Sequence, residues 1–313
     1  MDDQPPMRVA VVGGGSWGTT VAHLAARNAP TQLHTRRDDV AEAINTRHEN
    51  PRYLAGYQLN EQLVASTDLR HVVEHADVLV MGVPSSGFRE TLQEARPYLR
   101  PWVPVLSLSK GLEAGTKKRM TQVAEDELPG HPVGVLTGPN LAKEILAGYA
   151  AAAVIAFTDP TIATRLQPIF SSKLFRVYTN DDVIGCEIAG ALKNVTAIAA
   201  GMADGVDAGD NTRAMVITRG LAELTRLGLA MGGEPATFAG LAGMGDLLAT
   251  CMSPQSRNRH VGEELGRGKP IDTIIAEMNQ VAEGVKSAGI VMELAEEYGV
   301  SMPIASQISA CIR

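Results

Sequence analysis

The chain has 313 residues, enough for two domains, and 45% of them are hydrophobic, as in a globular protein with a sizeable core. Its formal net charge of −7 disfavours a general nucleic-acid-binding function, which usually needs a basic surface. The first residues lack the basic and apolar regions of a signal peptide, and no apolar run is long enough to predict membrane insertion. Three widely spaced cysteines without a CxxC pair predict a cytoplasmic protein with no disulfide framework and no metal.

The first half of the chain alternates β-like runs with helical patterns. Runs at 7–12 and 31–35 enclose a helical pattern at 18–28 and form a βαβ opening. Helical patterns such as 86–98 and 116–127 lie between most of the later runs, which are 63–66, 77–83, 103–108, 132–136, 151–157 and 174–178. This alternation predicts an α/β fold of the Rossmann type, a largely parallel sheet covered on both faces.

The pattern changes near residue 181. Beyond it, helical periodicity dominates and strand-like runs almost disappear, as in 182–202, 211–231, 270–278, 283–298 and 303–312. We therefore predict a dinucleotide-binding domain over 1–181 and an all-helical substrate and catalytic domain over 182–313.

A glycine-rich turn follows the first predicted strand and opens the first predicted helix. Its spacing is Gly13-x-Gly15-x-x-Gly18. The first glycine permits a tight turn, the second a close approach of the backbone to a pyrophosphate, and the third close packing of helix and strand. The alternative is a plain turn, but the strand–turn–helix context favours a dinucleotide on the N–H groups of the helix N-terminus.

The end of the second predicted strand bears on the choice of dinucleotide. NAD-preferring sites usually have an acidic residue there that binds the ribose 2′-hydroxyl. This chain has Arg36 and Arg37, and guanidinium groups suit a 2′-phosphate. The alternative is that Asp38 or Asp39 serves as the ribose acid. We predict NADPH or NADP in preference to NADH or NAD.

The most distinctive residue of the helical half is Lys193, which stands alone in an apolar helix. At about 100° per residue it shares a face with small residues, among them Ala189, Gly190 and Ala197. Burial of an amine favours its neutral form, which suits a lysine to exchange a proton with an alcohol or a carbonyl. The alternative is a lysine whose stem packs while its amine reaches solvent.

Two further segments of the helical half carry polar residues after turns. Asp246 follows two glycines and is interpreted either as a helix N-cap or as a carboxylate that orients Lys193 or binds substrate hydroxyls. Ser256 is a candidate N-cap, and Arg257 and Asn258 then fall in the first helical turn, among free N–H groups. A cation there opposes the helix dipole and indicates a bound anion, although a basic surface turn is the alternative.

Two turns of the first half also follow strands. Lys110 lies after one and the segment Gly138-Pro139-Asn140 after the next. In open α/β sheets the ligand crevice lies at the carboxyl ends of the strands, so we expect these residues, with Arg257 and the glycine turn, to line one cleft.

Taken in order, eight motifs resemble the bacterial-type NAD(P)-dependent glycerol-3-phosphate dehydrogenases over nearly the whole chain. They are GGGSWGTT, SLSKGLE, TGPNLAKE, GALKNVTAIAAG, NTRAMVITRGLAE, GMGDLLATC, QSRNR and QVAEGVKS. The resemblance implies reversible hydride transfer between NAD(P)H and dihydroxyacetone phosphate, giving sn-glycerol 3-phosphate for phospholipid synthesis. It also implies a homodimer.

The resemblance carries residue roles onto this sequence. Lys193 is implied to be the catalytic acid and base. The implied substrate residues are Lys110, Gly138, Asn140, Asp246, Ser256, Arg257 and Asn258. The implied cofactor residues, besides the glycines of the turn, are Ser16, Trp17, Arg36, Arg37, Tyr53, Lys110, Ala142, Arg257, Val281 and Glu283.

Two alternatives remain open at this point. One is a related two-domain dehydrogenase of the 3-hydroxy-acid or 6-phosphogluconate type. The other is a dinucleotide sensor without catalysis, against which Lys193 and Asp246 both argue.

Overall fold

The computed structural model describes residues 6–278 and 282–312. The chain divides into two compact units, the first of residues 1–109, 120–136 and 140–181, and the second of residues 110–119, 137–139 and 182–313. The predicted domain limits, 1–181 and 182–313, stay a prediction. They place 110–119 and 137–139 in the first half, whereas these two segments pack with the second unit.

The first unit is built on an eight-stranded sheet in the order β3-β2-β1-β4-β5-β6-β7-β8. The strands are β1 (Val9–Val12), β2 (Thr31–His34), β3 (Val64–Ser66), β4 (Val78–Met81), β5 (Val105–Ser107), β6 (Val133–Thr137), β7 (Ala151–Phe157) and β8 (Phe175–Asn180). The neighbours from β3 to β6, and the pair β7–β8, run parallel. The predicted largely parallel Rossmann-type sheet is therefore confirmed. The first and last residues of each predicted strand lie within two residues of those observed.

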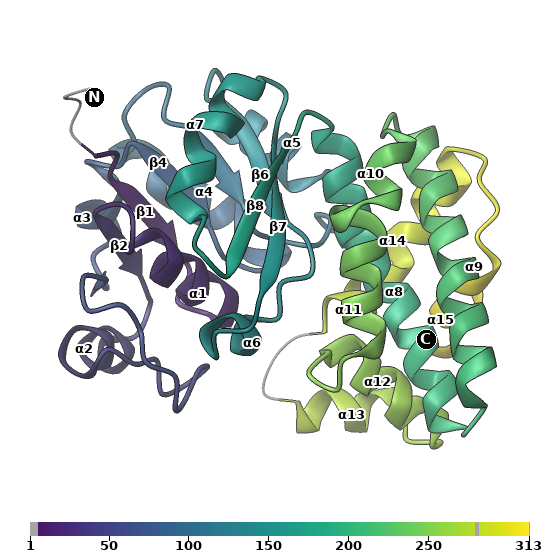
Figure 1. Cartoon of the computed structure of the whole chain (residues 1–313). Coiled ribbons are helices and arrows are strands. Elements are labelled where there is room, and N and C mark those ends of the chain that lie inside the picture. The colour runs from purple at the N-terminus through teal and green to yellow at the C-terminus, as the bar shows by residue number, and fades with distance from the viewer. Residues whose placement is uncertain (1–5, 279–281, 313) are drawn as a thin grey trace. The chain divides into compact units, whose positions relative to one another are not determined.

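Helices cover both faces of this sheet (Figure 1). They are α1 (Ser16–Ala25), α2 (Asp38–Arg47), α3 (Leu69–Val73), α4 (Phe88–Ala95), α5 (Met120–Glu127), α6 (Ala142–Leu146) and α7 (Pro160–Phe170), with short 3₁₀ turns η1 (Ser85–Gly87) and η2 (Arg96–Tyr98). Alternate residues of β1 pack into two different hydrophobic clusters. Val9 and Val11 pack in the cluster that contains Val21 of α1, and Ala10 and Val12 in the one that contains Phe88 of α4.

The second unit is helical, as predicted, and its centre is α8 (Val183–Gly205). The other helices are α9 (Gly209–Ala230), α10 (Pro235–Ala239), the π-helical turn η3 (Leu241–Gly245), α11 (Asp246–Met252), α12 (Arg257–Gly266), α13 (Ile271–Glu277), α14 (Glu283–Glu297) and α15 (Pro303–Ile312). Helices α9, α11, α12 and α14 pack around α8 (Figure 1). By length and composition α8 is apolar enough to cross a membrane, but 94% of its most apolar window is buried inside the protein.

Candidate functional site

The glycine turn of the first unit joins β1 to α1. Gly13 has a φ of +120°, and a Cβ on it would lie 2.5 Å from the Gly82 carbonyl oxygen. A Cβ on Gly18 would lie 2.0 Å from the carbonyl oxygen of Gly13, so this glycine lets helix and strand pack closely. At Gly15, the N-cap of α1, a Cβ would meet nothing within 4 Å, and no side chain caps the helix. The turn therefore leaves room and free N–H groups for a phosphate.

The buried side chain of Asn50 stabilises the glycine turn through hydrogen bonds. The Asn50 side-chain amide donates to the carbonyl oxygen of Gly14 and to the hydroxyl of Thr19, both at 3.0 Å. Its Oδ1 accepts from the backbone N–H of Tyr53 at 3.3 Å, and Ser16 Oγ donates to the Tyr53 carbonyl oxygen at 3.5 Å. Asn50 thus brings the predicted residues Ser16 and Tyr53 together. The sequence analysis did not predict this role of Asn50.

Two predicted side chains of the first unit carry buried polar atoms without a hydrogen-bond partner among the described residues. They are the indole N–H of Trp17, whose ring lies 6.4 Å from that of Phe175, and both amide atoms of Asn140. Buried polar atoms usually have partners, so unpaired ones fit a place where a ligand supplies them. Together with the open space at Gly15, the Trp17 donor fits a dinucleotide. Ala142, also predicted, is the first residue of α6.

The two arginines predicted to bind the 2′-phosphate, Arg36 and Arg37, differ in their side-chain hydrogen bonds. Arg37 donates from Nε and an NH2 group to both carboxylate oxygens of Asp39, each at 2.9 Å. Asp38 accepts from the Thr67 hydroxyl at 2.8 Å. Arg36 is exposed and makes no hydrogen bond within the described chain.

In the second unit, Asp246 holds two lysines. Lys193 Nζ donates to its Oδ1 and Lys110 Nζ to its Oδ2, both at 2.7 Å. Lys110 also donates to the carbonyl oxygen of Gly138 at 2.8 Å. The side chains of Lys193 and Asp246 are 6% and 2% exposed, so this is a buried cluster with one more positive than negative charge when both amines are protonated. Burial lowers the pKa of Lys110 to about 8, against the carboxylate of Asp246, which raises it.

Thr250, which the sequence patterns did not single out, completes the environment of Lys193. Its hydroxyl accepts from Lys193 Nζ at 2.5 Å and donates to the carbonyl oxygen of Asp246 at 2.7 Å. Asp246 is the first residue of α11 and not its N-cap, because the N-cap is Gly245. The π-helical turn η3 runs directly into α11, and such turns often occur at functional sites.

A hairpin of the segment 110–119 fixes the position of Lys110. Leu112 and Arg119 form an antiparallel bridge, and Leu112 packs in the core with residues of α8. Arg119 makes a 2.5 Å ion pair with Glu187 of α8, whose side chain is 5% exposed. A Cβ on Gly190 would lie 3.4 Å from Lys110 Cγ. The face of small residues predicted on α8 thus receives the lysine of this hairpin.

A chain of amides runs beside the lysine cluster. The Gly284 N–H donates to Asn258 Oδ1 at 2.9 Å, and Asn258 Nδ2 donates to Asn194 Oδ1 at 2.9 Å. Asn194 Nδ2 in turn donates to the carbonyl oxygen of Lys110 at 3.0 Å. The chain ties α14, α12 and α8 to the hairpin. Asn194, next to Lys193 on α8, had no predicted role.

The predicted helix start at 256–258 is present. Ser256 is the N-cap of α12 and accepts from the Arg259 N–H at 3.2 Å. Loss of hydration lowers the pKa of Arg257, and the negative charge of Glu283 raises it, which places these two predicted residues within electrostatic range. Val281, predicted as a cofactor contact, lies outside the described residues.

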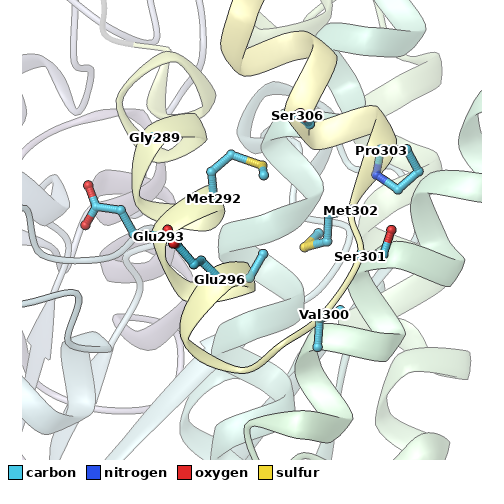
Figure 2. A pocket seen from close by; sticks show the side chains of 10 residues that line it. Gly289, Met292, Glu293, Glu296, Val300, Ser301, Met302, Pro303 and Ser306 are labelled. Carbon is cyan, nitrogen blue, oxygen red and sulfur yellow. The ribbon is translucent and has the colours of Figure 1, made fainter.

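A groove lies between α14 and α15 of the second unit (Figure 2). It is lined by Gly289, Met292, Glu293, Ala295, Glu296, Val300, Ser301, Met302, Pro303 and Ser306. Its charged side chains are two carboxylates, and no lysine or arginine lines it. Such a groove does not suit a phosphate ester.

Two family models together match most of the chain. Residues 8–163 match the N-terminal part, and residues 182–313 the C-terminal part, of the family described as NAD-dependent glycerol-3-phosphate dehydrogenase. The chain is 63% identical over 302 residues to glycerol-3-phosphate dehydrogenase [NAD(P)+] 2 of Sphingopyxis alaskensis, covering 96% of this chain and 91% of the relative. It is 59% identical to the Mycobacterium avium glycerol-3-phosphate dehydrogenase [NAD(P)+], covering 97% and 90%. A crystal structure of glycerol-3-phosphate dehydrogenase from Coxiella burnetii matches with a TM-score of 0.93 at 35% identity, covering 98% of this chain and 95% of that one.

Proposed function

The chain belongs to the NAD-dependent glycerol-3-phosphate dehydrogenase family, and from this we propose a role for each residue of the site. The activity is that of an NAD(P)-dependent glycerol-3-phosphate dehydrogenase, an oxidoreductase that interconverts dihydroxyacetone phosphate and sn-glycerol 3-phosphate. The observation that supports the assignment of roles best is the single carboxylate of Asp246, which binds both Lys193 and Lys110.

Lys193 is the general acid and base. Asp246 and Thr250 accept two of the three hydrogens of its ammonium group, which leaves one to point at the substrate. In the direction of reduction, Lys193 protonates the carbonyl oxygen of dihydroxyacetone phosphate as negative charge develops there. In the reverse direction, neutral Lys193 takes the proton from the hydroxyl of glycerol 3-phosphate. The nicotinamide dinucleotide, when bound, supplies or accepts the hydride.

The phosphate of the substrate is bound by cations and by the start of α12. Lys110 contributes charge, Ser256 fixes the helix start, and Arg257 and Asn258 supply donors in its first turn. Gly138 and Asn140 contact the remainder of the substrate. Asn140 offers both a donor and an acceptor that have no partner among the described residues.

The dinucleotide binds to the glycine turn of the first unit. The N-terminus of α1, with Ser16 and Trp17, would hold its phosphates, and Arg36 and Arg37 would favour the 2′-phosphate of NADPH. Tyr53 and Ala142 of the same unit would be further contacts, and the resemblance of the motifs also implies Arg257, Val281 and Glu283. We also propose that the enzyme is a cytoplasmic homodimer that serves phospholipid synthesis, as the resemblance of its motifs implies.

One assay separates this proposal from its alternatives. Purified protein with NADPH should reduce dihydroxyacetone phosphate, followed by the loss of nicotinamide absorbance, and should reduce 3-oxo acids poorly. A 3-hydroxy-acid or 6-phosphogluconate type of dehydrogenase would prefer its own substrate. A sensor would bind NADPH without turnover.

The role of Lys193 is tested by the substitution Lys193→Ala. Loss of the general acid should lower kcat by at least about a hundredfold while the Kd for NADPH stays unchanged. Substitution of the exposed Lys143→Ala is the control and should leave both values unchanged. Retained turnover in Lys193→Ala would remove this residue from the mechanism.

A further inference from the structure

We propose that Asp39 moderates the preference for NADPH over NADH by binding Arg37, so that Arg36 alone is ready to receive a 2′-phosphate. The inference rests on the proposed function, namely that a nicotinamide dinucleotide binds at the glycine turn with its adenosine ribose near the end of β2. It adds a residue that acts on specificity through another side chain.

The contact between Arg37 and Asp39 uses the same geometry that a phosphate would need. Arg37 Nε and one NH2 group donate to the two oxygens of the carboxylate at 2.9 Å each. This is the bidentate arrangement in which a guanidinium binds a phosphate. A 2′-phosphate must therefore displace Asp39 from this edge of Arg37 or bind to the other edge. The side-chain hydrogen bonds of the pair lower the pKa of Asp39 and raise that of Arg37.

The charge of Asp39 acts in the same direction. A carboxylate at the N-terminus of α2 repels a 2′-phosphate, whereas an uncharged 2′-hydroxyl meets no such repulsion. Both effects weaken the binding of NADPH and leave that of NADH unaffected. The pair is exposed, with the side chains of Arg37 and Asp39 at 51% and 64%, so its effect is moderate and does not abolish NADPH binding.

The neighbouring charges make Arg36 the available cation. Arg36 follows β2 directly, is exposed, and has no hydrogen bond to any part of the chain that the structure describes. Asp38 is engaged by the hydroxyl of Thr67 at 2.8 Å. The four charges at 36–39 therefore consist of one free cation, one internal ion pair and one carboxylate bound to a threonine.

The test measures the Kd for NADPH and for NADH separately, by calorimetric titration of the full chain. Asp39→Asn should bind NADPH about two- to fivefold more tightly, the range expected for release of an exposed ion pair, and should bind NADH as the wild type does. Glu42→Gln removes one negative charge from the exposed surface of the same helix and is the matched control, which should change neither constant.

A double-mutant cycle isolates the contact. Arg37→Gln should weaken NADPH binding only slightly in the wild type. Added to Asp39→Asn, it should cancel the part of the gain that comes from the release of Arg37 and leave only the part that comes from the lost repulsion. Three results would overturn the inference: an unchanged NADPH constant in Asp39→Asn, an equal gain in Glu42→Gln, or a loss of NADH binding in Asp39→Asn, which would make Asp39 the ribose acid. If the wild type binds neither dinucleotide, the proposed function itself fails.

Discussion

At the scale of single residues, the candidate site of the helical unit is organised by Asp246, which binds a different lysine with each of its two carboxylate oxygens. One oxygen binds Lys193 and the other binds Lys110, so the two lysines have fixed and separate positions. Thr250 supplies a further acceptor to Lys193, and Gly138 one to Lys110. Buried charges are tolerated only with such partners, and the remaining positive charge suits an anionic substrate.

The protonation of Lys110 predicts a pH dependence of phosphate binding. Burial lowers the pKa of this lysine from the ordinary 10.5 to about 8, so its positive charge predominates below pH 8 and is lost as the pH rises through 8. Inhibition by inorganic phosphate, competing with dihydroxyacetone phosphate, should therefore weaken above pH 8. The same shift makes the stability of the fold rise with pH between about 8 and 10.5, because in this window the unfolded chain binds a proton that the folded chain has lost.

The matched variant is Lys110→Arg, which stays charged over the whole range. Its inhibition constant for phosphate should not rise near pH 8, even if its absolute value differs from that of the wild type. The same rise in both proteins would mean that another group causes it.

At the scale of secondary-structure elements, the site depends on how closely α12 approaches α8. A Cβ on Gly262 would lie 1.9 Å from the carbonyl oxygen of Ile198, and one on Gly201 would lie 2.0 Å from that of Arg259. Glycines on both helices thus allow their backbones to touch. Because α12 begins at Arg257, the same contact sets the distance of the predicted phosphate-binding residues from Asn194.

The substitution Gly262→Ala tests this approach. The added methyl group should force α12 away from α8, destabilise the fold by about 1–3 kcal/mol and raise the KM for dihydroxyacetone phosphate. The free energy of unfolding in urea and steady-state kinetics measure the two effects. Gly289→Ala in α14 is the control, because its Cβ meets nothing within 4 Å. It should stabilise the protein by about 0.5–1 kcal/mol, the usual gain of alanine over glycine in a helix.

At the scale of the whole molecule, the two units build their cores differently. The first places helices on both faces of a sheet, and the second surrounds a single buried helix.

In the first unit, α1 carries the glycine turn at one end and the buried His23 near the other. His23 Nδ1 accepts from the backbone N–H of Asn60 at 2.9 Å, and the Arg27 guanidinium lies 2.8 Å from Nε2.

This histidine predicts a loss of stability in mild acid. Burial and the charge of Arg27 lower its pKa from 6.5 to about 4. The unfolded chain therefore binds a proton between pH 6.5 and 4 that the folded chain does not, and stability falls by up to about 1.4 kcal/mol for each pH unit in this window. In urea unfolding at pH 7, 6 and 5, His23→Gln should show a shallower fall than the wild type. The exposed His260→Gln should follow the wild type, and a parallel fall in all three proteins would contradict the assignment.

Local patterns in the sequence determined the elements and the reactive residues. The glycine spacing located the turn after β1, and apolar periodicity placed Lys193 on one face of a long helix, because both signals lie within a few turns of chain. Only the tertiary structure decided which residues meet. Asp246 lies 136 positions from Lys110 and 53 from Lys193, and Asn50, Asn194 and Thr250 have no local signature at all. Contacts of this kind depend on how whole helices pack, which no short stretch of sequence determines. The segment 110–119 is an example, because its neighbours in sequence belong to the sheet unit whereas the segment itself packs against α8.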